Sequence, residues 1–252
     1  QIEYMPKKIL LAQVEEVDHV VSIISDYDPL ELSGVDSKKI MQRQLAGKFY
    51  KTALFGKWNK GVGSWALGMY ATEGMAKQAG LSVEEYWEQI SNACFLSEDD
   101  PIAKWTEVYT EIYRILDYLN SLDMEWVNIK GQDCDLNIYI GEQRKWLGGS
   151  GHNIPSFECF ISPDWRKTNG WIKFNQPLLR YGSRIEGIEL EFKDGIVVKA
   201  KASLNQDLLE DMLAQENANK VGEFSLTDKK LSRITKFMAQ TLFDENVGGP
   251  FG

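Results

Sequence analysis

The sequence contains few cysteines and few histidines, the residues that form disulfides and many metal sites. It has three cysteines, Cys94, Cys134 and Cys159, which lie far apart and form no CxxC pair. This pattern predicts reduced thiols in a cytoplasmic protein rather than a disulfide framework. It has two histidines, His19 and His152, too few for a metal site built mainly from imidazoles. No Lys/Arg-rich run occurs and the net charge is -9, which argues against nucleic acid or an anionic membrane as the main partner.

Other absences narrow the class of protein further. No apolar run reaches the roughly 18 residues of a membrane-spanning helix, and no signal peptide opens the chain. No low-complexity segment or internal repeat is present. The 252 residues, 43% hydrophobic and 26% charged, are typical of a globular protein with a substantial core. We also expect a fragment, because the first residues enter a helix without an initiator Met and the last stop on a Gly-rich turn.

The first half of the chain alternates helical and strand patterns. Helices are expected over residues 6–17 and 36–50, each followed by an apolar strand, at 20–24 and 64–72. This order predicts a parallel sheet with helical crossovers. Three further helices are expected, at 73–79, at 82–95 with a capping box between Ser82 and Glu85, and from Asp100 to about residue 119. One apolar stripe of the last helix is expected to face the core: Ile102, Trp105, Val108, Tyr109, Ile112, Leu116 and Leu119.

From Met124 onward the pattern becomes β-rich. Strands are expected in MEWVNIKG, CDLNIYIGEQRKWLGG and EFSLTD, with three or four more between Thr168 and Ala202 and one helix over about 205–215. The Asp194-Gly195 pair is typical of a tight hairpin. The predicted fold class is α/β plus α+β. An N-terminal α/β domain with a parallel sheet is expected at 1–123, and a β-rich domain, truncated at its C-terminal end, at 124–252.

Three acids lie in unusually apolar or turn-rich surroundings. Glu158 lies inside FECFI, Glu223 begins an apolar run in VGEFSL, and Glu245 leads into a Gly-rich turn in TLFDENVGG. An unpaired carboxylate buried in such a run costs several kcal/mol, so Glu158 either points to water or meets a cation. The ordinary interpretation is that each acid faces solvent or pairs with Lys or Arg. The alternative is that these carboxylates converge on divalent cations, which favour oxygen ligands.

Longer strings favour the metal interpretation. The relevant segments are YMPKK, VDHVVSIISD, DPIAKW, GSGHNIPSFECFISPDW, ANKVGEFSL and SRITKFMAQTLFDENVGG. Together they resemble the thermophilic metalloaminopeptidase family, of the aminopeptidase T, aminopeptidase S and PepS type. NIPSFE, SPDW and TLFDEN in this order form a specific combined signal, and the resemblance covers essentially the whole chain. It implies a soluble, dimeric exopeptidase with an N-terminal α/β domain and a β-rich C-terminal domain that binds two divalent ions.

The resemblance also implies roles for the three acids. Glu158 and Glu223 match metal ligands, with Glu223 bridging the ions, and Glu245 matches a third acid that acts as a ligand or as the catalytic proton acceptor. The two ions are expected to be zinc or cobalt, with manganese or magnesium as alternatives. The implied protein is a cytoplasmic, homodimeric metalloprotease. It would release N-terminal residues from peptides with a free N-terminus, through a water activated by two metals.

The sequence departs from the family pattern after Glu245. The family's histidine ligand follows the FDEN string, and a second histidine and an aspartate come later, but residues 248–252 contain no histidine. The chain as given is therefore expected to be inactive. The alternative function is a non-catalytic binding or dimerisation module of the aminopeptidase type, with an incomplete metal centre.

The histidines and one Gly-rich string carry weaker signals. His152 comes six residues before Glu158, but it is expected in a turn or at the surface, and His19 is expected to have a structural role. The string from Gly148 to Gly151 is not followed by a helix, so we expect a turn there rather than a phosphate-binding loop. A Rossmann-like nucleotide-binding enzyme, which depends on the N-terminal half alone, stays a third alternative.

Overall fold

A helical layer built around a short parallel sheet forms the first part of the chain. The computed structural model describes residues 2–248. Helix α1 (Lys7–Glu16) leads into β1 (His19–Ile24), and α2 (Ser37–Trp58) leads into β2 (Ser64–Met69). The two strands pair in parallel, as the helix–strand–helix–strand order predicts. Helix α2 was expected to end near residue 50 but continues to Trp58, because its last turn is held by contacts with the corner between α1 and β1.

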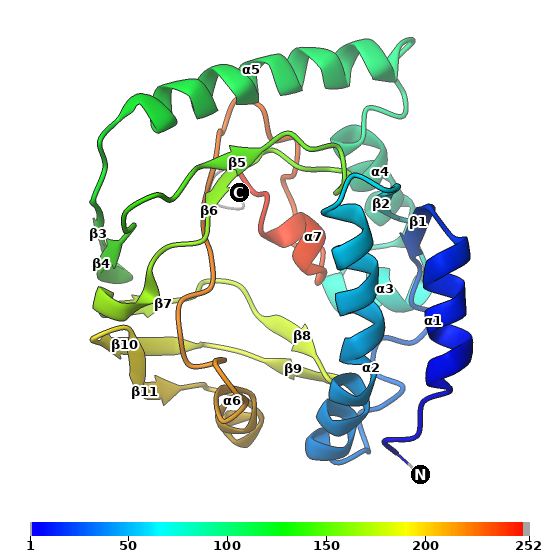
Figure 1. Cartoon of the computed structure of the whole chain (residues 1–252), viewed down its shortest axis with the longest axis horizontal. Helices are drawn as coiled ribbons and strands as arrows, with labels where there is room; N and C mark the ends of the chain where they lie inside the picture. Colours follow the sequence, from blue (N-terminus) through cyan, green and yellow to red (C-terminus); the bar gives the residue numbers. More distant parts are fainter. Residues whose placement is uncertain (1, 249–252) are drawn as a thin grey trace.

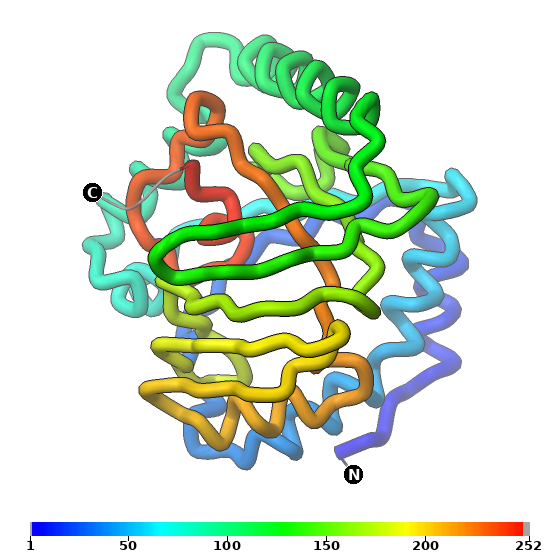
Figure 2. The backbone as a smooth tube through the Cα atoms, turned by 90° about the vertical axis from the view of Figure 1, so that its left-hand side faces the viewer, coloured from blue at the N-terminus to red at the C-terminus, as the bar shows by residue number. Residues whose placement is uncertain are grey.

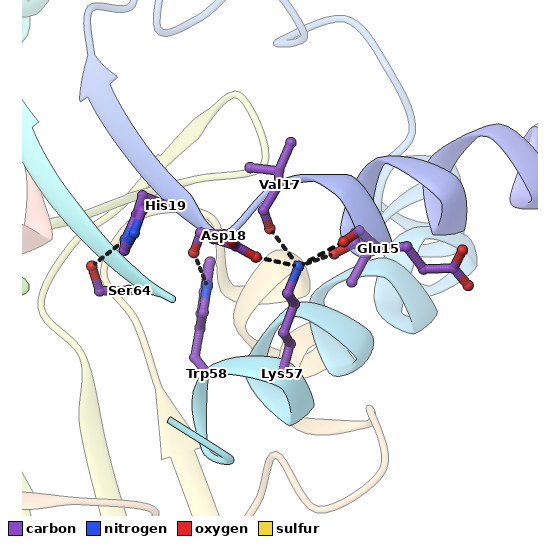
Figure 3. Close-up of polar contacts among 8 residues, drawn as sticks. Glu15, Val17, Asp18, His19, Lys57, Trp58 and Ser64 are labelled. Carbon is purple, nitrogen blue, oxygen red and sulfur yellow. Dashed lines mark hydrogen bonds and ion pairs between the residues drawn. The ribbon is translucent and has the colours of Figure 1, made fainter. Parts of the chain in front are cut away.

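The contacts at that corner centre on the amino group of Lys57 (Figure 3). This ammonium donates hydrogen bonds to the carbonyl oxygens of Val14, Glu15 and Val17 at 2.8–3.0 Å and pairs with Asp18 at 2.8 Å. Carbonyl groups at a helix C-terminus have no partner within the helix, so a cation there satisfies them and the helix dipole together.

His19 has the structural role expected of it. Its ring Nδ1 lies 3.0 Å from the Ser64 hydroxyl, across the pair of parallel strands (Figure 3). The contact joins the first residues of β1 and β2.

Three helices follow, with boundaries within two residues of those expected. They are α3 (Glu73–Ala79), α4 (Val83–Ala93) and α5 (Pro101–Ser121). The capping box of Ser82 and Glu85 is present at the start of α4. In α5 the predicted stripe buries Val108, Ile112 and Leu116, but Ile102 is 79% exposed because the first turn of the helix extends beyond the core. Within residues 2–248, none of the helices is both long and apolar enough to cross a bilayer.

The β-rich part contains a five-stranded antiparallel sheet, whose strands lie one above another in Figure 2. Their order is β11-β10-β7-β4-β3. The strands are β3 (Trp126–Gly131), β4 (Cys134–Tyr139), β7 (Asn169–Lys173), β10 (Glu189–Lys193) and β11 (Ile196–Lys201). Asp194 and Gly195 both have positive φ, at 49° and 78°, which confirms the predicted tight hairpin between β10 and β11. A Cβ at Gly195 would lie 1.8 Å from the Trp165 carbonyl oxygen, so no larger residue fits there.

A second, three-stranded sheet carries the candidate site. Its order is β12-β6-β5, with β5 (Leu147–Gly148), β6 (Glu158–Ile161) and β12 (Phe224–Thr227) all antiparallel. Helix α5 runs along the top of the molecule and contacts β5 and β6 (Figure 1). The other elements of this part are η1 (Trp165–Lys167), β8 (Leu178–Arg180), β9 (Ser183–Ile185), α6 (Gln206–Leu213) and α7 (Thr241–Asp244).

One hydrophobic cluster connects the two parts of the chain. It includes Met69 and Tyr86 from the helical part and Phe157, Ile161 and Phe243 from the β-rich part. A smaller cluster lies between α2, α6 and the β8–β9 hairpin. The mixed fold class is confirmed, while the division into domains near Asp123 stays a prediction. The Gly-rich turn predicted at the C-terminal end extends into residues 249–252, which lie outside the described residues.

Candidate metal centre

The backbone around Glu158 is fixed from both sides. Glu158 is the first residue of β6 and pairs with Thr227 of β12, while the next residue, Cys159, pairs with Gly148 of β5. A Cβ at Gly148 would lie 2.5 Å from the carbonyl oxygen of Glu158, so only glycine permits this close approach of β5. Just before the strand, the backbone N–H of Phe157 donates a 2.7 Å hydrogen bond to the side-chain oxygen of Asn246.

The Glu158 carboxyl is buried, and no described residue forms a salt bridge with it. The residue is 5% exposed, and its Oε2 has no hydrogen-bond partner among the described residues. Burial raises the pKa of Glu158, the negative charge of Glu223 raises it further, and the Ser225 hydroxyl opposes the shift. A buried carboxylate that lacks both a cation and a full set of hydrogen bonds is costly, so a ligand that supplies positive charge would be favoured here.

Glu223 reaches the same region through the strand register. It directly precedes β12, in which Thr227 lies opposite Glu158. Because side chains alternate along a strand, Thr227, Ser225 and Glu223 share the face on which Glu158 lies. Although Glu223 is exposed at the surface, partial loss of solvation raises the pKa of its carboxyl.

Glu245 lies at the C-terminal end of α7. The helix is anchored by Leu242 and Phe243, which are 4% and 0% exposed. Glu245 is itself exposed at the surface, yet burial of its carboxyl raises its pKa to about 7, helped by the negative charges of Glu158, Glu223 and Asp244. The three predicted site residues are therefore close enough to affect one another's ionisation.

The neighbouring Asp244 shapes the loop before Glu245. Its two carboxylate oxygens accept the backbone N–H groups of Met238 at 2.7 Å and Gln240 at 2.8 Å. Burial raises the pKa of Asp244 to about 6, and these two hydrogen bonds oppose the shift. Asp244 is thus committed to the backbone, which leaves Glu245 as the acid of this loop that is available to a ligand.

The three acids influence one another's pKa values, but this does not make a complete metal site. In the part of the chain that the structure describes, no three or more His, Cys, Asp or Glu side chains are gathered so that they could hold a metal ion. The assignment of Glu158, Glu223 and Glu245 as metal ligands, with Glu245 as a catalytic group, stays a prediction.

His152 lies in a loop, as expected, but its ring is not free. Its Nδ1 lies 2.7 Å from the carbonyl oxygen of Trp65, and the two rings stack with centroids 4.6 Å apart. The loop itself pairs with β2. The N–H of Leu67 donates to the carbonyl oxygen of His152, and the N–H of Ile154 donates to the carbonyl oxygen of Leu67. This segment therefore joins the parallel sheet to the strand that begins at Glu158, a long-range contact that the sequence pattern did not indicate.

A cavity of about 820 Å³ opens beside Glu245. Asp244 and Glu245 line one part of it, and the β8–β9 hairpin and α6 line another. The sequence pattern did not indicate this cavity. The apolar residues of the hairpin and of α6 have the spacing of ordinary core positions, which does not distinguish a cavity wall from a packed interior.

Comparisons with known proteins agree with this architecture. Residues 1–250 match the family described as thermophilic metalloprotease (M29). The chain is 29% identical to aminopeptidase T of Thermus thermophilus, over 89% of this chain and 59% of the relative, and 30% identical to aminopeptidase AmpS of Bacillus subtilis, over 90% and 60%. The chain thus spans about three fifths of the length of these curated relatives.

A solved structure shares the fold. Wild-type AmpT from Thermus thermophilus superposes with a TM-score of 0.83, over 97% of this chain and 65% of that one, at 24% sequence identity. At this level of identity the likeness shows the arrangement of helices and strands.

Proposed function

The chain belongs to the family of thermophilic metalloproteases (M29), and on this premise we propose that it forms part of a metal-dependent aminopeptidase. The proposed reaction is the release of N-terminal residues from peptides. Two observations support it: the similar curated proteins are named aminopeptidases, and acids of the β-rich part lie within each other's electrostatic influence. Further parts of the proposal are a homodimer in the cytoplasm and peptides with a free N-terminus as substrates.

The observation that carries the proposal is the unpartnered Oε2 of Glu158. This atom is buried and no side chain among the described residues donates to it, so the site fits a cation that binds through oxygen ligands. Glu158, Glu223 and Glu245 would hold the ions, two in number, with zinc or cobalt favoured over manganese or magnesium. When bound, such an ion polarises the scissile carbonyl and lowers the pKa of a water molecule.

The protein's own residues would orient the site and move the proton. The pairing of β6 with β5 and β12 fixes the position of Glu158, and Glu223 lies on the same face. The carboxyl of Glu245 would accept a proton from the attacking water and return it to the departing amine. A positioned carboxyl is one of the groups that can act as general base and then general acid in such an exchange.

One observation favours a second candidate, a non-catalytic peptide-binding or dimerisation module. Among the described residues, no group of three potential ligands is gathered for a metal. An incomplete centre would bind ions weakly and would not support turnover. For the chain as given, we expect no hydrolysis of Leu-p-nitroanilide with added cobalt.

The experiment that tests the metal proposal is a calorimetric titration of the chain with zinc, cobalt and manganese. Glu158→Gln keeps the size of the side chain and removes its charge, and it is expected to abolish measurable binding. Asp164→Asn changes another buried acid, six residues away in the sequence, and is expected to bind ions as the unaltered chain does. Equal affinities of the unaltered chain and the Glu158→Gln variant would overturn the assignment of Glu158 as a ligand.

A further inference from the structure

A single buried side chain joins the two segments that carry Glu158 and Glu245. Asn246 is 0% exposed and directly follows Glu245. Its side-chain oxygen accepts the backbone N–H of Phe157 at 2.7 Å, and Phe157 directly precedes Glu158. Among the described residues, this is the only hydrogen bond between residues 241–246 and residues 155–161. The two acids are therefore tied together through their immediate neighbours, across 89 positions of the chain.

Both ends of the Asn246 amide are used. Its nitrogen donates to the carbonyl oxygen of Leu242 at 3.2 Å, four residues earlier, while its oxygen faces the N–H of Phe157. The backbone carbonyl oxygen of Asn246 accepts a hydrogen bond from the Ser232 hydroxyl at 2.5 Å. A side-chain amide has distinct donor and acceptor ends, so an amide bonded at both ends in the interior has one orientation. Asn246 thus fixes the C-terminal end of α7 relative to β6.

Helix α7 needs such contacts because it has only four residues. A helix of this length is not stable by itself, and its direction is set by what it packs against. Asp244 holds the loop before it, through the N–H groups of Met238 and Gln240, and Asn246 holds its C-terminal end. Glu245 lies between these two anchored residues and is exposed at the surface. The two anchors therefore constrain the direction of its carboxyl group.

A second asparagine makes the same pair of bonds in another part of the fold. The side-chain oxygen of Asn169 accepts the N–H of Asp194 at 2.9 Å, and its nitrogen donates to the carbonyl oxygen of Lys167 at 2.8 Å. Asn169 begins β7 in the five-stranded sheet, whereas Glu158 lies in the three-stranded sheet. No candidate metal ligand adjoins Asn169 or Asp194 in the sequence. Asn169 is therefore a reference for an asparagine with a purely structural role.

We infer that Asn246 is a positioning residue of the candidate metal centre, which holds Glu245 and Glu158 in the relative position from which both bind metal. This inference rests on the proposed function, because it takes these two acids as ligands. It adds a residue that contacts neither metal nor substrate and acts through the N–H of Phe157. Residues that orient a metal ligand in this indirect way typically change metal affinity by about 10- to 100-fold.

The test divides the two bonds of the Asn246 amide between two variants. In Asn246→Ser the side chain is too short to reach the N–H of Phe157, but its hydroxyl can still donate to the Leu242 carbonyl oxygen. Asn246→Asp keeps the shape and the oxygen that accepts from Phe157 but loses the donor to Leu242. Calorimetric titration with zinc is expected to show a loss of affinity of at least about tenfold in Asn246→Ser, while Asn246→Asp retains at least about a third of the affinity.

The matched control is Asn169→Ser, the same replacement at the reference asparagine. It is expected to leave zinc affinity unchanged to within about twofold, because its two bonds hold a strand and a hairpin that carry no candidate ligand. Circular dichroism and urea denaturation check that all three variants fold and measure how far each is destabilised. A purely structural role of Asn246 would lower stability without separating Asn246→Ser from Asn169→Ser in zinc affinity.

A measurement on the unaltered chain does not depend on the folding of any variant. If the bond between Asn246 and Phe157 favours metal binding, bound metal must favour that bond by the same factor. Zinc is therefore expected to slow hydrogen exchange of the Phe157 amide by at least about tenfold relative to buffer with EDTA, as followed by NMR. The amide of Asp194, which is bonded to Asn169, should exchange at the same rate in both buffers.

The outcomes separate this inference from the proposed function. Three results would overturn the positioning role while Glu158→Gln still abolishes zinc binding. They are an unchanged zinc affinity in a folded Asn246→Ser variant, an equal loss in Asn246→Ser and in Asn246→Asp or Asn169→Ser, and a Phe157 amide that zinc does not protect. Absence of zinc binding by the unaltered chain would reject the metal centre and the positioning role together.

Discussion

Two buried carboxylates, six residues apart in the sequence, behave in opposite ways. Glu158 is 5% exposed and Asp164 is 6% exposed. The guanidinium of Arg166 donates hydrogen bonds to both carboxylate oxygens of Asp164, through Nε at 2.8 and 3.1 Å and also through Nη2. Arg166 lowers the pKa of Asp164 to about 2, whereas burial and the charge of Glu223 raise the pKa of Glu158.

Burial alone therefore does not decide whether an acid in this fold has a raised or a lowered pKa. Asp164 has its counter-charge two residues away in the chain, so its negative form is favoured. Among the described residues, none donates a hydrogen bond to Oε2 of Glu158. Asp164 is therefore an acid that is already satisfied, and the unpartnered Glu158 supports the proposal that an added ion binds there.

The largest expected effect concerns metal affinity. Removing a metal's second-shell partner costs about 10- to 100-fold in affinity, so loss of a ligand in Glu158→Gln is expected to cost at least about 100-fold. Asp164→Asn is expected to change affinity less than about twofold, since its carboxylate is already occupied by Arg166. Calorimetric titration with zinc measures both. Equal losses in the two variants would remove the distinction between the two acids.

The next effect is on the stability of the metal-free chain. We expect Asp164→Asn to lower this stability and Glu158→Gln to leave it unchanged or to raise it. Asp164→Asn weakens the charged hydrogen bonds with Arg166, whose side chain is 70% exposed, and we expect a loss of about 1 kcal/mol in the free energy of unfolding. Glu158→Gln removes a buried charge and is expected to leave this free energy unchanged or to raise it. Urea denaturation monitored by circular dichroism checks both variants, and destabilisation by Glu158→Gln larger than that by Asp164→Asn would contradict the account.

The contribution of Asp164 is expected to vanish in acid. Its pKa in the folded chain is about 2, below the value of about 3.9 for an unperturbed aspartate. A lowered pKa means that the stabilisation is fully present above the unfolded value and is lost as the pH falls through the folded one. The difference in unfolding free energy between the unaltered chain and Asp164→Asn should therefore shrink between about pH 4 and pH 2. A difference that stays constant over this range would show that the ion pair is not its source.

The smallest effect is a shift in the ionisation of Glu158 itself. Glu223→Gln removes the nearby negative charge, so the pKa of Glu158 is expected to fall in this variant. It should stay above the ordinary glutamate range, because burial is the larger cause of the shift. NMR titration of the side-chain carboxyl signals of metal-free protein measures this pKa. No change would mean that the two carboxyls do not share a face as the strand register indicates.

Local signals in the sequence predicted much of the fold. The boundaries of α3, the capping box of α4 and the Asp194-Gly195 hairpin follow from caps and turn residues close in the chain, and all are confirmed. Features that depend on distant contacts were missed. Helix α2 extends to Trp58 because Lys57 finds carbonyl partners on α1, and the His152 ring is stacked on Trp65, 87 residues away.

The same limit applies to the candidate site. An acid inside an apolar run marks Glu158 as unusual from the sequence, and in the part of the chain that the structure describes its buried Oε2 has no hydrogen-bond partner. The sequence could not predict that Arg166 would neutralise Asp164, since a charged residue two positions away reaches its neighbour only in a suitable turn. Nor could it predict the cavity, whose lining residues range from Asp26 to Glu245.

Whether Glu158 binds a metal ion is tested most directly by a crystal structure of the protein grown with zinc or cobalt, with anomalous diffraction recorded at the metal edge. We expect an anomalous peak within about 2.0–2.2 Å of a Glu158 carboxylate oxygen, the usual bonding distance, and no peak at Asp164. Metal bound elsewhere while the Glu158 carboxyl stays without an ion would contradict it.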